Sequence, residues 1–327
     1  MIEMQRHIKK MPAVLAMLGV LLAVGGAAGE KTMTDMGAVG FYAVHRTPTP
    51  ITIDGRLDEP AWQFAEQING FERILSDYGR VEHPTRARML WDDDHLYIGF
   101  AALDPDIWAI YTQRNDPLWT EEVVEVFIDP DGSGKNYLEL EVNPLNAVVD
   151  LKVERAYPRL QASVDWDIAG LQTAVQIYGT VNDSLSRDYG WTVEIAIPWT
   201  ALEGEIDGGQ RPEPGDEWRL NLYRIERTGG RRLKENIEAL KAGIPPLETE
   251  KDSILTTVIE VHGSPEYLSA MEQNRVDQIR EELVEMRMEL ETLQDLHHER
   301  TEYTAWTPTW RQGFHHPERF GVVRFVE

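Results

Sequence analysis

Apolar and polar positions alternate along most of the chain after residue 41, and turn-forming residues separate the alternating runs. A period of two is that of β-strands with one buried face. The clearest runs are 51–55, 85–91, 95–103, 123–129, 137–144, 147–153, 191–199, 217–227 and 320–326. Because little helical pattern lies between them, we predict an all-β domain, an antiparallel β-sandwich, over residues 41–327.

One predicted hairpin places acidic side chains opposite one another. Residues 123–129 and 137–143 each carry apolar side chains on one face, and the turn composition Asp-Gly-Ser-Gly lies between them. On the other face we expect Glu125 to lie opposite Glu141 or a close neighbour. Like charges placed directly opposite each other destabilise a sheet. We therefore expect compensation by bulk water, a cation, an arginine from a neighbouring strand or a ligand rich in hydroxyl groups.

A different period appears in residues 264–303. Ser264 suits a helix N-cap and Pro265 the first helical position. Apolar side chains then recur at spacings of three and four, at Val276, Ile279, Leu283, Met286, Leu290 and Leu293. We predict one long amphipathic helix over 265–300, which either packs on its own sheet or forms a homodimer through its apolar seam. The preceding TGGRRLKENIEALKAGIPPLETEKDS is polar and irregular, so we take 228–303 as a single insertion in the sandwich.

The start of the chain has the organisation of a secretory signal peptide. Basic residues, the apolar run AVLAMLGVLLAVG and the small residues GGAAG follow one another within residues 1–28. The apolar run is short for a membrane-spanning helix, and an uncleaved signal anchor is the alternative. We expect cleavage near Ala28, a flexible leader over 29–40, and an exported protein that has no membrane attachment after cleavage.

Charge and cysteine content limit the partners and the compartment. The formal net charge of −24 and the pI near 4.8 argue against nucleic acid and anionic membrane surfaces, because both would repel so acidic a chain. The sequence contains no cysteine, which excludes disulfides, a lipoprotein anchor and a thiol nucleophile. Stability must therefore come from packing. An exported protein without disulfides fits a bacterial periplasm or the exterior.

Several stretches resemble the family 9 carbohydrate-binding modules. They are ITIDGRLDEPAWQFAEQINGF (51–71), ARMLWDDDHLYIGFAALDPD (87–106) and LWTEEVVEVFIDPDG (118–132), and TPTWRQGFHHPERFGVVRF (307–325) is similar to the C-terminal end of exported family 9-like proteins. The resemblance implies an immunoglobulin- or jelly-roll-like sandwich of the DOMON-like type with structural calcium. It also implies non-catalytic binding of a saccharide, often at the chain end of a plant-type polysaccharide, between two tryptophan rings, in support of extracellular carbohydrate catabolism.

The family's W-x-x-x-x-x-E pattern matches Trp119 and Glu125. A tryptophan ring stacks on the apolar face of a pyranose, and a carboxylate accepts hydrogen bonds from vicinal hydroxyl groups. The alternative is that Trp119 is a core or rim residue and Glu125 a solvated strand residue. The family takes its second ring from a loop towards the C-terminus, where Trp306 is our candidate and Trp310 the alternative.

Two further residues complete the predicted carbohydrate site. Glu141 shares the acidic face with Glu139, and this face is more acidic than the resemblance leads us to expect. Arg88, or Arg86 on the same predicted strand, would neutralise that face if the strands are neighbours. A plain surface role for these arginines is the alternative.

Calcium has two candidate positions in the sequence. Asp129, Asp131 and Ser133 have the D-x-D-x-S spacing of part of a calcium loop and offer the hard oxygen ligands that Ca²⁺ prefers. A tight hairpin turn uses the same residue types. The run 92–94, with three aspartates, is a weaker alternative because it also suits a turn between strands.

Three rival functions are open at this point. Paired carboxylates suit a glycosidase, but the three acids of the hairpin face carry no active-site signature. We therefore expect no enzyme, although association with glycosyl hydrolases fits the resemblance. Haem needs an axial histidine or methionine in a dry pocket, and we expect none from the histidine pairs at 297–298 and 315–316. The third rival is an envelope interaction protein that self-associates through its helix.

Overall fold

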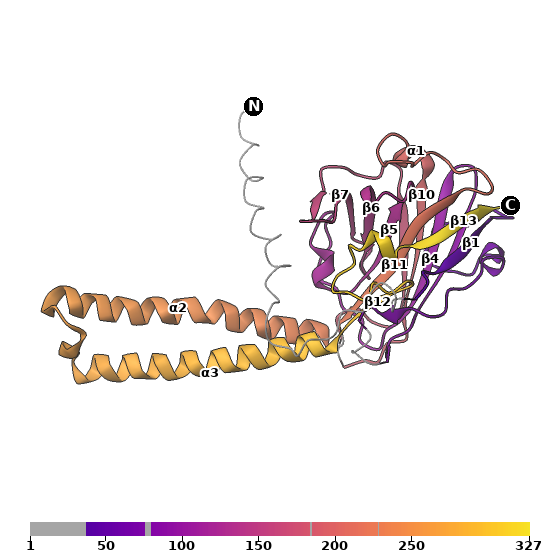
Figure 1. Cartoon of the computed structure of the whole chain (residues 1–327). Coiled ribbons are helices and arrows are strands. Elements are labelled where there is room, and N and C mark those ends of the chain that lie inside the picture. The colour runs from indigo at the N-terminus through magenta and orange to yellow at the C-terminus, as the bar shows by residue number, and fades with distance from the viewer. Residues whose placement is uncertain (1–36, 76–79, 184, 228) are drawn as a thin grey trace, which may run out of the picture. The chain divides into compact units, whose positions relative to one another are not determined.

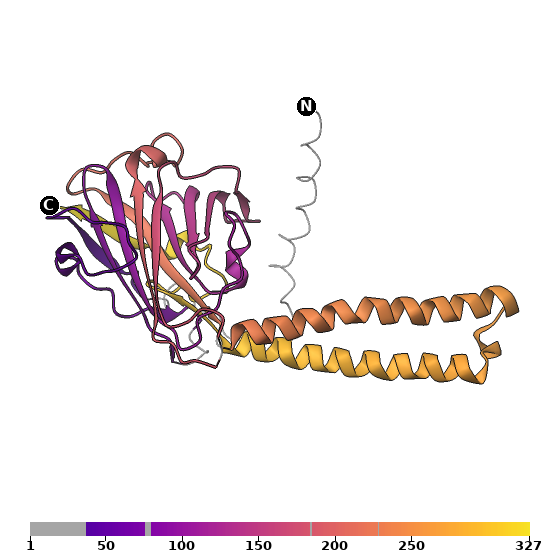
Figure 2. The same cartoon turned by 180° about the vertical axis from the view of Figure 1, so that it is seen from behind.

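The alternating runs, except 51–55, form strands of one sheet that curls on itself (Figures 1 and 2). The strand predicted over 51–55 is wrong, because these residues form a loop that ends in a bend. Its order is β8-β7-β6-β5-β11-β13-β1-β3-β4-β10-β9, with β12 paired to β11 and β2 paired to β12. The strands are β1 (Phe41–Arg46), β2 (Glu72–Arg73), β3 (Thr85–Trp91), β4 (His95–Leu103), β5 (Val123–Asp129), β6 (Lys135–Val142), β7 (Val148–Arg155), β8 (Gln161–Ser163), β9 (Gln172–Tyr178), β10 (Gly190–Pro198), β11 (Glu217–Arg227), β12 (Thr301–Ala305) and β13 (Gly321–Val326).

This structure is a computed structural model that describes residues 37–75, 80–183, 185–227 and 229–327. Within these residues, Gly37–Glu327 forms one unit. The predicted signal peptide and most of the predicted leader lie outside the described residues. No helix among the described residues is both long enough and apolar enough to cross a bilayer.

The sheet is mixed, so the prediction of a purely antiparallel sandwich is wrong in this respect. β1 runs parallel to both of its neighbours, β13 and β3. The other pairs are antiparallel, including β5 with β6 and with β11. Alternation has the same period in parallel and antiparallel strands. Alternation therefore cannot show the direction in which β1, which was not among the predicted runs, meets its partners.

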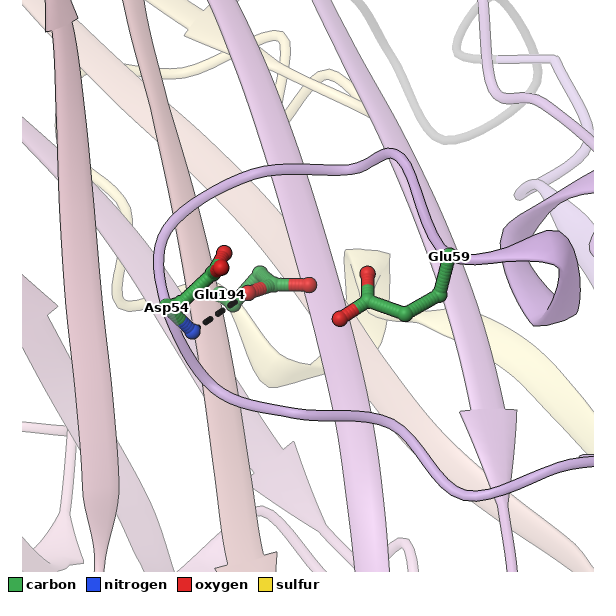
Figure 3. A group of neighbouring side chains, drawn as sticks. All are labelled: Asp54, Glu59 and Glu194. Carbon is green, nitrogen blue, oxygen red and sulfur yellow. Dashed lines mark hydrogen bonds between the residues drawn. The ribbon is translucent and has the colours of Figure 1, made fainter.

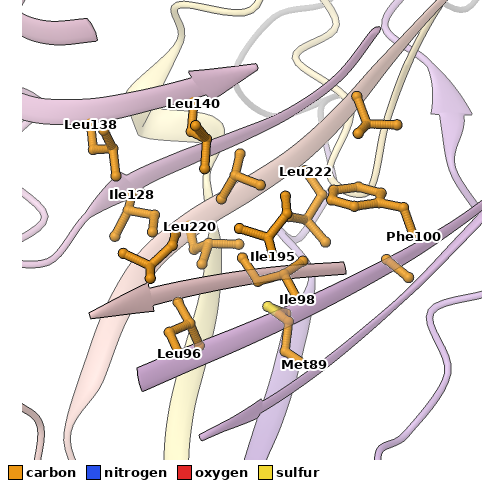
Figure 4. Close-up of a cluster of buried hydrophobic side chains, with 14 of the residues drawn as sticks. Met89, Leu96, Ile98, Phe100, Ile128, Leu138, Leu140, Ile195, Leu220 and Leu222 are labelled. Atoms are coloured by element: carbon orange, nitrogen blue, oxygen red, sulfur yellow. The ribbon is translucent and has the colours of Figure 1, made fainter. Parts of the chain in front are cut away.

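The curl of the sheet brings its two halves face to face around one apolar core. Met89, Leu96, Ile98 and Phe100 lie in the half that holds β3 and β4, while Ile128, Leu138 and Leu140 lie in the half that holds β5 and β6 (Figure 4). Ile128, Leu138 and Leu140 are among the apolar positions that alternation had assigned to one face of each hairpin strand. Full burial of such a side chain contributes about 1.5–3 kcal/mol, which is how a chain without disulfides holds this fold.

A second apolar layer covers the opposite face of β5, β6 and β11. Phe127 and Tyr223 belong to the sheet, and Phe314 and Phe320 come from the segment between β12 and β13. Phe314 stacks on Tyr223 with ring centres 4.2 Å apart, and Phe320 meets Phe127 edge to face at 5.8 Å. The face that carries the acidic side chains of the hairpin is therefore partly covered by the C-terminal segment.

The insertion contains two helices, and the prediction of a single helix over 265–300 is corrected. α2 (Gly230–His262) and α3 (Ala270–Arg300) run side by side and are joined by the short turn η5 (Pro265–Tyr267) (Figures 1 and 2). α3 begins after Ser269, whose side chain forms a capping box with Glu272. The predicted cap, Ser264, instead caps η5.

The segment expected to be irregular forms α2 although Pro245 and Pro246 lie inside it. Proline and glycine are poor residues for a helix interior, so local propensity argues against this helix. Packing against α3 provides the compensation, because Val258 of α2 is buried and so are apolar side chains of α3. The apolar seam predicted for a homodimer, with Val276, Ile279 and Leu283 buried, lies along this helix pair within one chain.

Candidate functional site

Trp119 lies in the short 3-10 helix η4 (Leu118–Thr120), just before β5. Its side chain is half-buried and packs against the second apolar layer. Its carbonyl accepts a hydrogen bond from Nη2 of Arg227 at 3.0 Å, and Nε of Arg227 donates to the carbonyl of Glu121 at 3.3 Å. Arg227, the last residue of β11, therefore holds the backbone that presents the Trp119 ring.

The acidic side chains of the hairpin converge, as the alternation predicted. Glu125 of β5 lies directly opposite Glu141 of β6, and Glu139 lies opposite Phe127. One carboxylate oxygen from each glutamate lies within 4.8 Å of the other two. The exposed fractions are 2% for Glu125, 6% for Glu139 and 1% for Glu141. We call Glu125, Glu139 and Glu141 the glutamate triad.

Burial makes ionisation of the glutamate triad costly. Desolvation raises the pKa of Glu139 to about 8. Desolvation, and then repulsion from the other glutamates, raises the pKa of Glu125 and of Glu141 well above the ordinary value. Two neighbours act the other way: the guanidinium of Arg227 lowers the pKa of Glu125, and the backbone amide of Trp119 lowers that of Glu141. The cation that acts on the triad is therefore Arg227, at the end of β11.

His315 lies beside the triad but carries no charge near neutral pH. Its Nε2 is 3.6 Å from Oε2 of Glu139, and its Nδ1 is 2.8 Å from the hydroxyl of Tyr137. Burial lowers the pKa of His315 to about 4, and His316 adds to this effect. The imidazole is therefore neutral near pH 7 and does not neutralise Glu139.

Arg88 does not face the glutamate triad. It lies on β3, whose partners are β1 and β4, whereas the triad lies on β5 and β6. Arg88 and Arg86 line a separate hollow of about 220 Å³ together with Gln67 and Tyr178. The expectation that Arg88 neutralises the acidic face is corrected, because the order of distant strands cannot be read from alternation alone.

Trp306 and Trp119 belong to different apolar layers. Trp306 packs against the main core and meets Tyr42 edge to face with ring centres 6.3 Å apart. A Cβ atom at Gly321 would lie 2.5 Å from the Trp306 ring, and one at Gly40 would lie 2.7 Å from it. The structure therefore does not bring Trp306 to Trp119 as the second wall of a slot. Trp310, the alternative, is half-buried in a left-handed backbone conformation with φ of 55°.

The two predicted calcium positions act as turn caps. Oδ2 of Asp129 accepts a hydrogen bond from the amide of Gly134 at 2.9 Å, and Oδ1 of Asp131 accepts one from the amide of Ser133 at 2.9 Å. Oδ1 of Asp92 likewise accepts from the backbone at the β3–β4 turn, at 2.8 Å. Oδ1 of Asp129 is buried without a hydrogen-bond partner among the described residues. Calcium at these two positions stays a prediction.

Sequence reasoning missed the residues that α2 and β11 bring to Trp119. Nζ of Lys234 donates to the carbonyl of Thr120 at 3.3 Å and lies 5.1 Å from the ring centre of Tyr111. No signal pointed to Lys234, because α2 was not predicted. Arg227 had a signal, since it shares the strand face of Tyr223, which lies opposite Glu125. This signal can be used only once the pairing of β5 with β11 is known.

Comparison with known proteins gives a family match for the part of the chain that holds the candidate site. Residues 53–212 match the model of the family described as carbohydrate family 9 binding domain-like. A proposed carbohydrate-binding protein from Bacteroides uniformis has the same fold, with a TM-score of 0.52 and 13% identity over 88% of this chain and 100% of that chain. No curated protein matches the chain.

Two structures of a family 9 carbohydrate-binding module from Caldicellulosiruptor kristjanssonii also match. The complex with cellotriose has a TM-score of 0.44 and 14% identity, over 88% of this chain and 93% of that chain. The complex with glucose has a TM-score of 0.38 and 18% identity, over 56% of this chain and 78% of that chain.

The family match covers β2 to β10 and therefore includes Trp119 and the whole glutamate triad. β11, the two long helices and the C-terminal segment lie beyond it. The resemblance noted in the sequence is confirmed over residues 53–212, which match the carbohydrate family 9 binding domain-like family; modules of this family bind carbohydrate and are not catalytic.

Proposed function

We propose that this protein is an exported, non-catalytic module that binds a saccharide with a pyranose ring stacked on Trp119. The observation that carries the proposal is the position of Trp119 beside Glu125 and Glu141. The ring is half-buried, the two carboxyl groups lie opposite each other in the sheet, and the backbone amide of Trp119 lowers the pKa of Glu141. All three residues lie within the family match.

The chemistry of this arrangement suits a neutral sugar. The indole offers an apolar face for stacking, and carboxyl groups offer hydrogen bonds to hydroxyl groups. An acidic sugar would be repelled by a chain whose formal net charge is −24. We therefore place the ligand among neutral oligosaccharides, such as the chain ends of plant-type polysaccharides, in support of their extracellular breakdown.

Titration calorimetry of the purified protein tests this proposal. Cello-oligosaccharides, xylo-oligosaccharides and monosaccharides would be titrated into the wild type and into Trp119→Ala. We expect saturable heat with one ligand class, and an affinity more than about tenfold lower for the variant, which corresponds to about 1.4 kcal/mol. The variant should keep the wild-type circular dichroism spectrum. Equal affinity of a folded Trp119→Ala variant would move the binding site away from this ring.

Trp310→Ala is the matched variant for the second ring. Trp310 is half-buried on the C-terminal segment, as Trp119 is on η4. If Trp310 forms the second wall of the slot, its replacement lowers affinity without greatly changing the melting temperature. An unchanged affinity would show that the saccharide stacks on Trp119 without Trp310.

Self-association is the second candidate, and we propose it only through the outer faces of the helices. The seam between α2 and α3 is already used within the chain, but Met271, Val284 and Met288 of α3 are 81%, 55% and 64% exposed. Exposed apolar side chains on one helix favour contact with a partner. Light scattering on the purified protein would show a dimer mass if these residues form an interface and a monomer mass if they do not.

A further inference from the structure

Buried charges in two parts of the molecule have partners within the chain. Glu194 of β10 lies beside Asp54 and Glu59 (Figure 3), and one of its carboxylate oxygens accepts hydrogen bonds at 2.9 Å from the backbone amides of Asp54 and Gly55. On β11, the buried guanidinium of Arg224 pairs with two buried carboxylates. The chain itself therefore balances these charges, and neither group requires a ligand.

Three cationic residues line a hollow of about 330 Å³ beside the turn between β5 and β6, which we call the turn hollow. Lys135 is the first residue of β6, Arg155 is the last residue of β7, and Arg219 lies on β11. Among the described residues, no carboxylate forms an ion pair with any of the three. Lys135 and Arg155 also lie directly opposite each other in the sheet, and like charges so placed destabilise it. The turn hollow therefore collects positive charge that the chain does not balance.

Two carboxylates beside the turn hollow have other partners. Glu318 lines the hollow, but its Oε1 lies 3.3 Å from Nη1 of Arg311 and 3.4 Å from Nδ1 of His316. The hydrogen bond with His316 lowers the pKa of Glu318, so this side chain is ionised near pH 7. Asp129 lies opposite Arg219 in the sheet, but its Oδ2 accepts a hydrogen bond at 2.9 Å from a backbone amide of the turn. The cations of the hollow therefore remain available to an anion from solution.

Glycine at two turn positions brings Arg219 and Pro317 against the turn. Gly132 and Gly134 have φ of 68° and 72°, in a left-handed region that glycine adopts most readily. A Cβ atom at Gly132 would lie 3.1 Å from Cγ of Arg219, and one at Gly134 would lie 3.0 Å from Cγ of Pro317. Nη2 of Arg219 also donates to the carbonyl of Glu318 at 3.4 Å. The turn and the C-terminal segment therefore hold the Arg219 side chain at the hollow.

The size and the lining of the turn hollow suit a small molecule rather than a free ion. Pockets for small molecules have volumes from about 300 Å³ upwards, and the turn hollow reaches this size. Tyr157 lines it and is 51% exposed. An exposed aromatic face can stack on the ring of a sugar. These features favour an anionic group that is carried on a small molecule.

We infer that the turn hollow binds the phosphate group of a phosphate monoester. Its three cations and one carboxylate leave two positive charges. A phosphate monoester carries a charge of about −1.5 to −2 near pH 7 and offers three strong acceptor oxygens, which guanidinium groups can bind in pairs. The net charge of −24 repels anions in general, but exposed charges more than about 8 Å away are largely screened at physiological ionic strength. The local cations therefore decide what binds here.

The turn hollow is separate from the proposed saccharide site. Lys135 precedes Glu141 by six residues on β6, which corresponds to about 20 Å along a strand. Neither Trp119 nor a residue of the glutamate triad lines the hollow. The inference therefore does not rest on the proposed function, and the two can be tested independently.

Titration calorimetry at low ionic strength with glucose 6-phosphate, inorganic phosphate and glucose tests the inference. Trp119→Ala is titrated beside the wild type, so that stacking on that ring does not contribute. In both proteins we expect saturable binding of glucose 6-phosphate, at least about tenfold tighter than that of inorganic phosphate, because the sugar ring fills the rest of the hollow. Glucose should not bind to Trp119→Ala. An affinity of this variant for glucose or for inorganic phosphate that equals its affinity for glucose 6-phosphate would overturn the inference, as would the absence of glucose 6-phosphate binding.

Arg155→Gln and Arg159→Gln form a matched pair for the position of the site. Both arginines are exposed, but only Arg155 lines the turn hollow. Arg155→Gln should weaken glucose 6-phosphate binding by about tenfold or more, as expected when a hydrogen bond to a charged group is lost. Arg159→Gln should keep the wild-type affinity. Equal losses in the two variants would show a general effect of net charge and would overturn the inference.

The same titrations separate failure of this inference from failure of the proposed function. A protein that binds neutral saccharide through Trp119 but does not bind glucose 6-phosphate in Trp119→Ala would overturn the inference alone. A protein that binds no neutral saccharide but keeps glucose 6-phosphate binding that depends on Arg155 would support the inference and contradict the proposed function.

Discussion

Nη1 of Arg227 donates a hydrogen bond to Nε2 of His297 at 3.0 Å, which joins the end of β11 to the last turn of α3. The same guanidinium donates to Oγ1 of Thr301 at 3.2 Å and to the carbonyl of Trp119 at 3.0 Å. Arg227 therefore ties the base of the helical insertion to the backbone that carries the proposed stacking ring. An acceptor at Nε2 requires the neutral form of His297.

Stability should fall as acid protonates His297. Burial, and then the positive charges of Arg227 and Lys234, lowers the pKa of His297 from 6.5 to about 4 in the folded protein. The unfolded chain therefore binds this proton at a higher pH than the folded chain does. The contribution is fully present above about pH 6.5 and is lost as pH falls towards 4. Urea unfolding between pH 4 and pH 8 measures it.

Glutamine is the matched replacement, because its side-chain oxygen can accept from Arg227 without titrating near neutral pH. Buried glutamates with raised pKa values respond to pH with the opposite sign, so the quantity to follow is the difference between wild type and His297→Gln. We expect the advantage of the wild type to shrink as pH falls from 6.5 to 4. A difference that is independent of pH would contradict the assigned role of His297.

Trp306→Ala should destabilise the protein without changing saccharide affinity. The ring packs between Gly40 and Gly321 and against Tyr42. Truncation of a large core side chain costs about 3 kcal/mol, which thermal or urea unfolding would detect. Trp119→Ala should show the reverse pattern, with lost affinity and a small change in stability. Loss of binding in a folded Trp306→Ala variant would restore this ring to the binding site.

Gly230→Ala and Gly243→Ala form a matched pair within α2. A Cβ atom at position 230 would lie 1.6 Å from Nε1 of Trp108, which donates to the carbonyl of Arg227 at 3.1 Å. We expect Gly230→Ala to displace Trp108 and to lower the free energy of unfolding by about 1–3 kcal/mol. Chemical denaturation would measure both variants.

At position 243 the added Cβ would meet Cε of Met286 at 2.6 Å, the far end of a flexible side chain. Alanine is the better helix former by up to about 1 kcal/mol. Gly243→Ala should therefore be neutral or stabilising. Equal destabilisation by the two substitutions would indicate that the Trp108 contact is not what distinguishes the two positions.

Local signals predicted more of this protein than remote ones. Alternation assigned the faces of β5 and β6, and the tight turn between them fixed Glu125 opposite Glu141, because both features act within a few residues. Alternation does not show that β11 rather than β3 is the neighbour of β5, so the sequence indicates Arg88 as the neutralising arginine where the structure has Arg227. Which strands become neighbours depends on contacts between segments that lie far apart in the sequence.

Two other differences have physical causes of the same kind. An apolar residue at the end of β12 can enter either of the two apolar layers, and its position in the sequence does not decide which layer receives Trp306. α2 contains Pro245 and Pro246, so its local pattern argues against a helix that the seam with α3 stabilises. Propensity is a weak guide where tertiary packing opposes it.

Shortening the helical insertion should leave the sandwich and its proposed site intact. The register pairs Arg227 of β11 with Thr301 of β12, so the helices are inserted between two paired strand positions. A short Gly-Ser loop from Gly243 to Met286, which lie close together, would remove the outer parts of α2 and α3. The base of the insertion, including His297 and Lys234, would remain. The buried residues that are lost are Val258, Val276, Ile279 and Leu283.

These lost side chains lie along the helix pair, so the shortened protein should unfold cooperatively with a melting temperature near that of the wild type. Its circular dichroism should show less helix, and its saccharide affinity should be unchanged. Light scattering on both proteins would reveal any dimer that depends on the outer helices as a change in mass. A shortened protein that aggregates or loses affinity would show that the outer helices are part of the binding domain rather than an insertion in it.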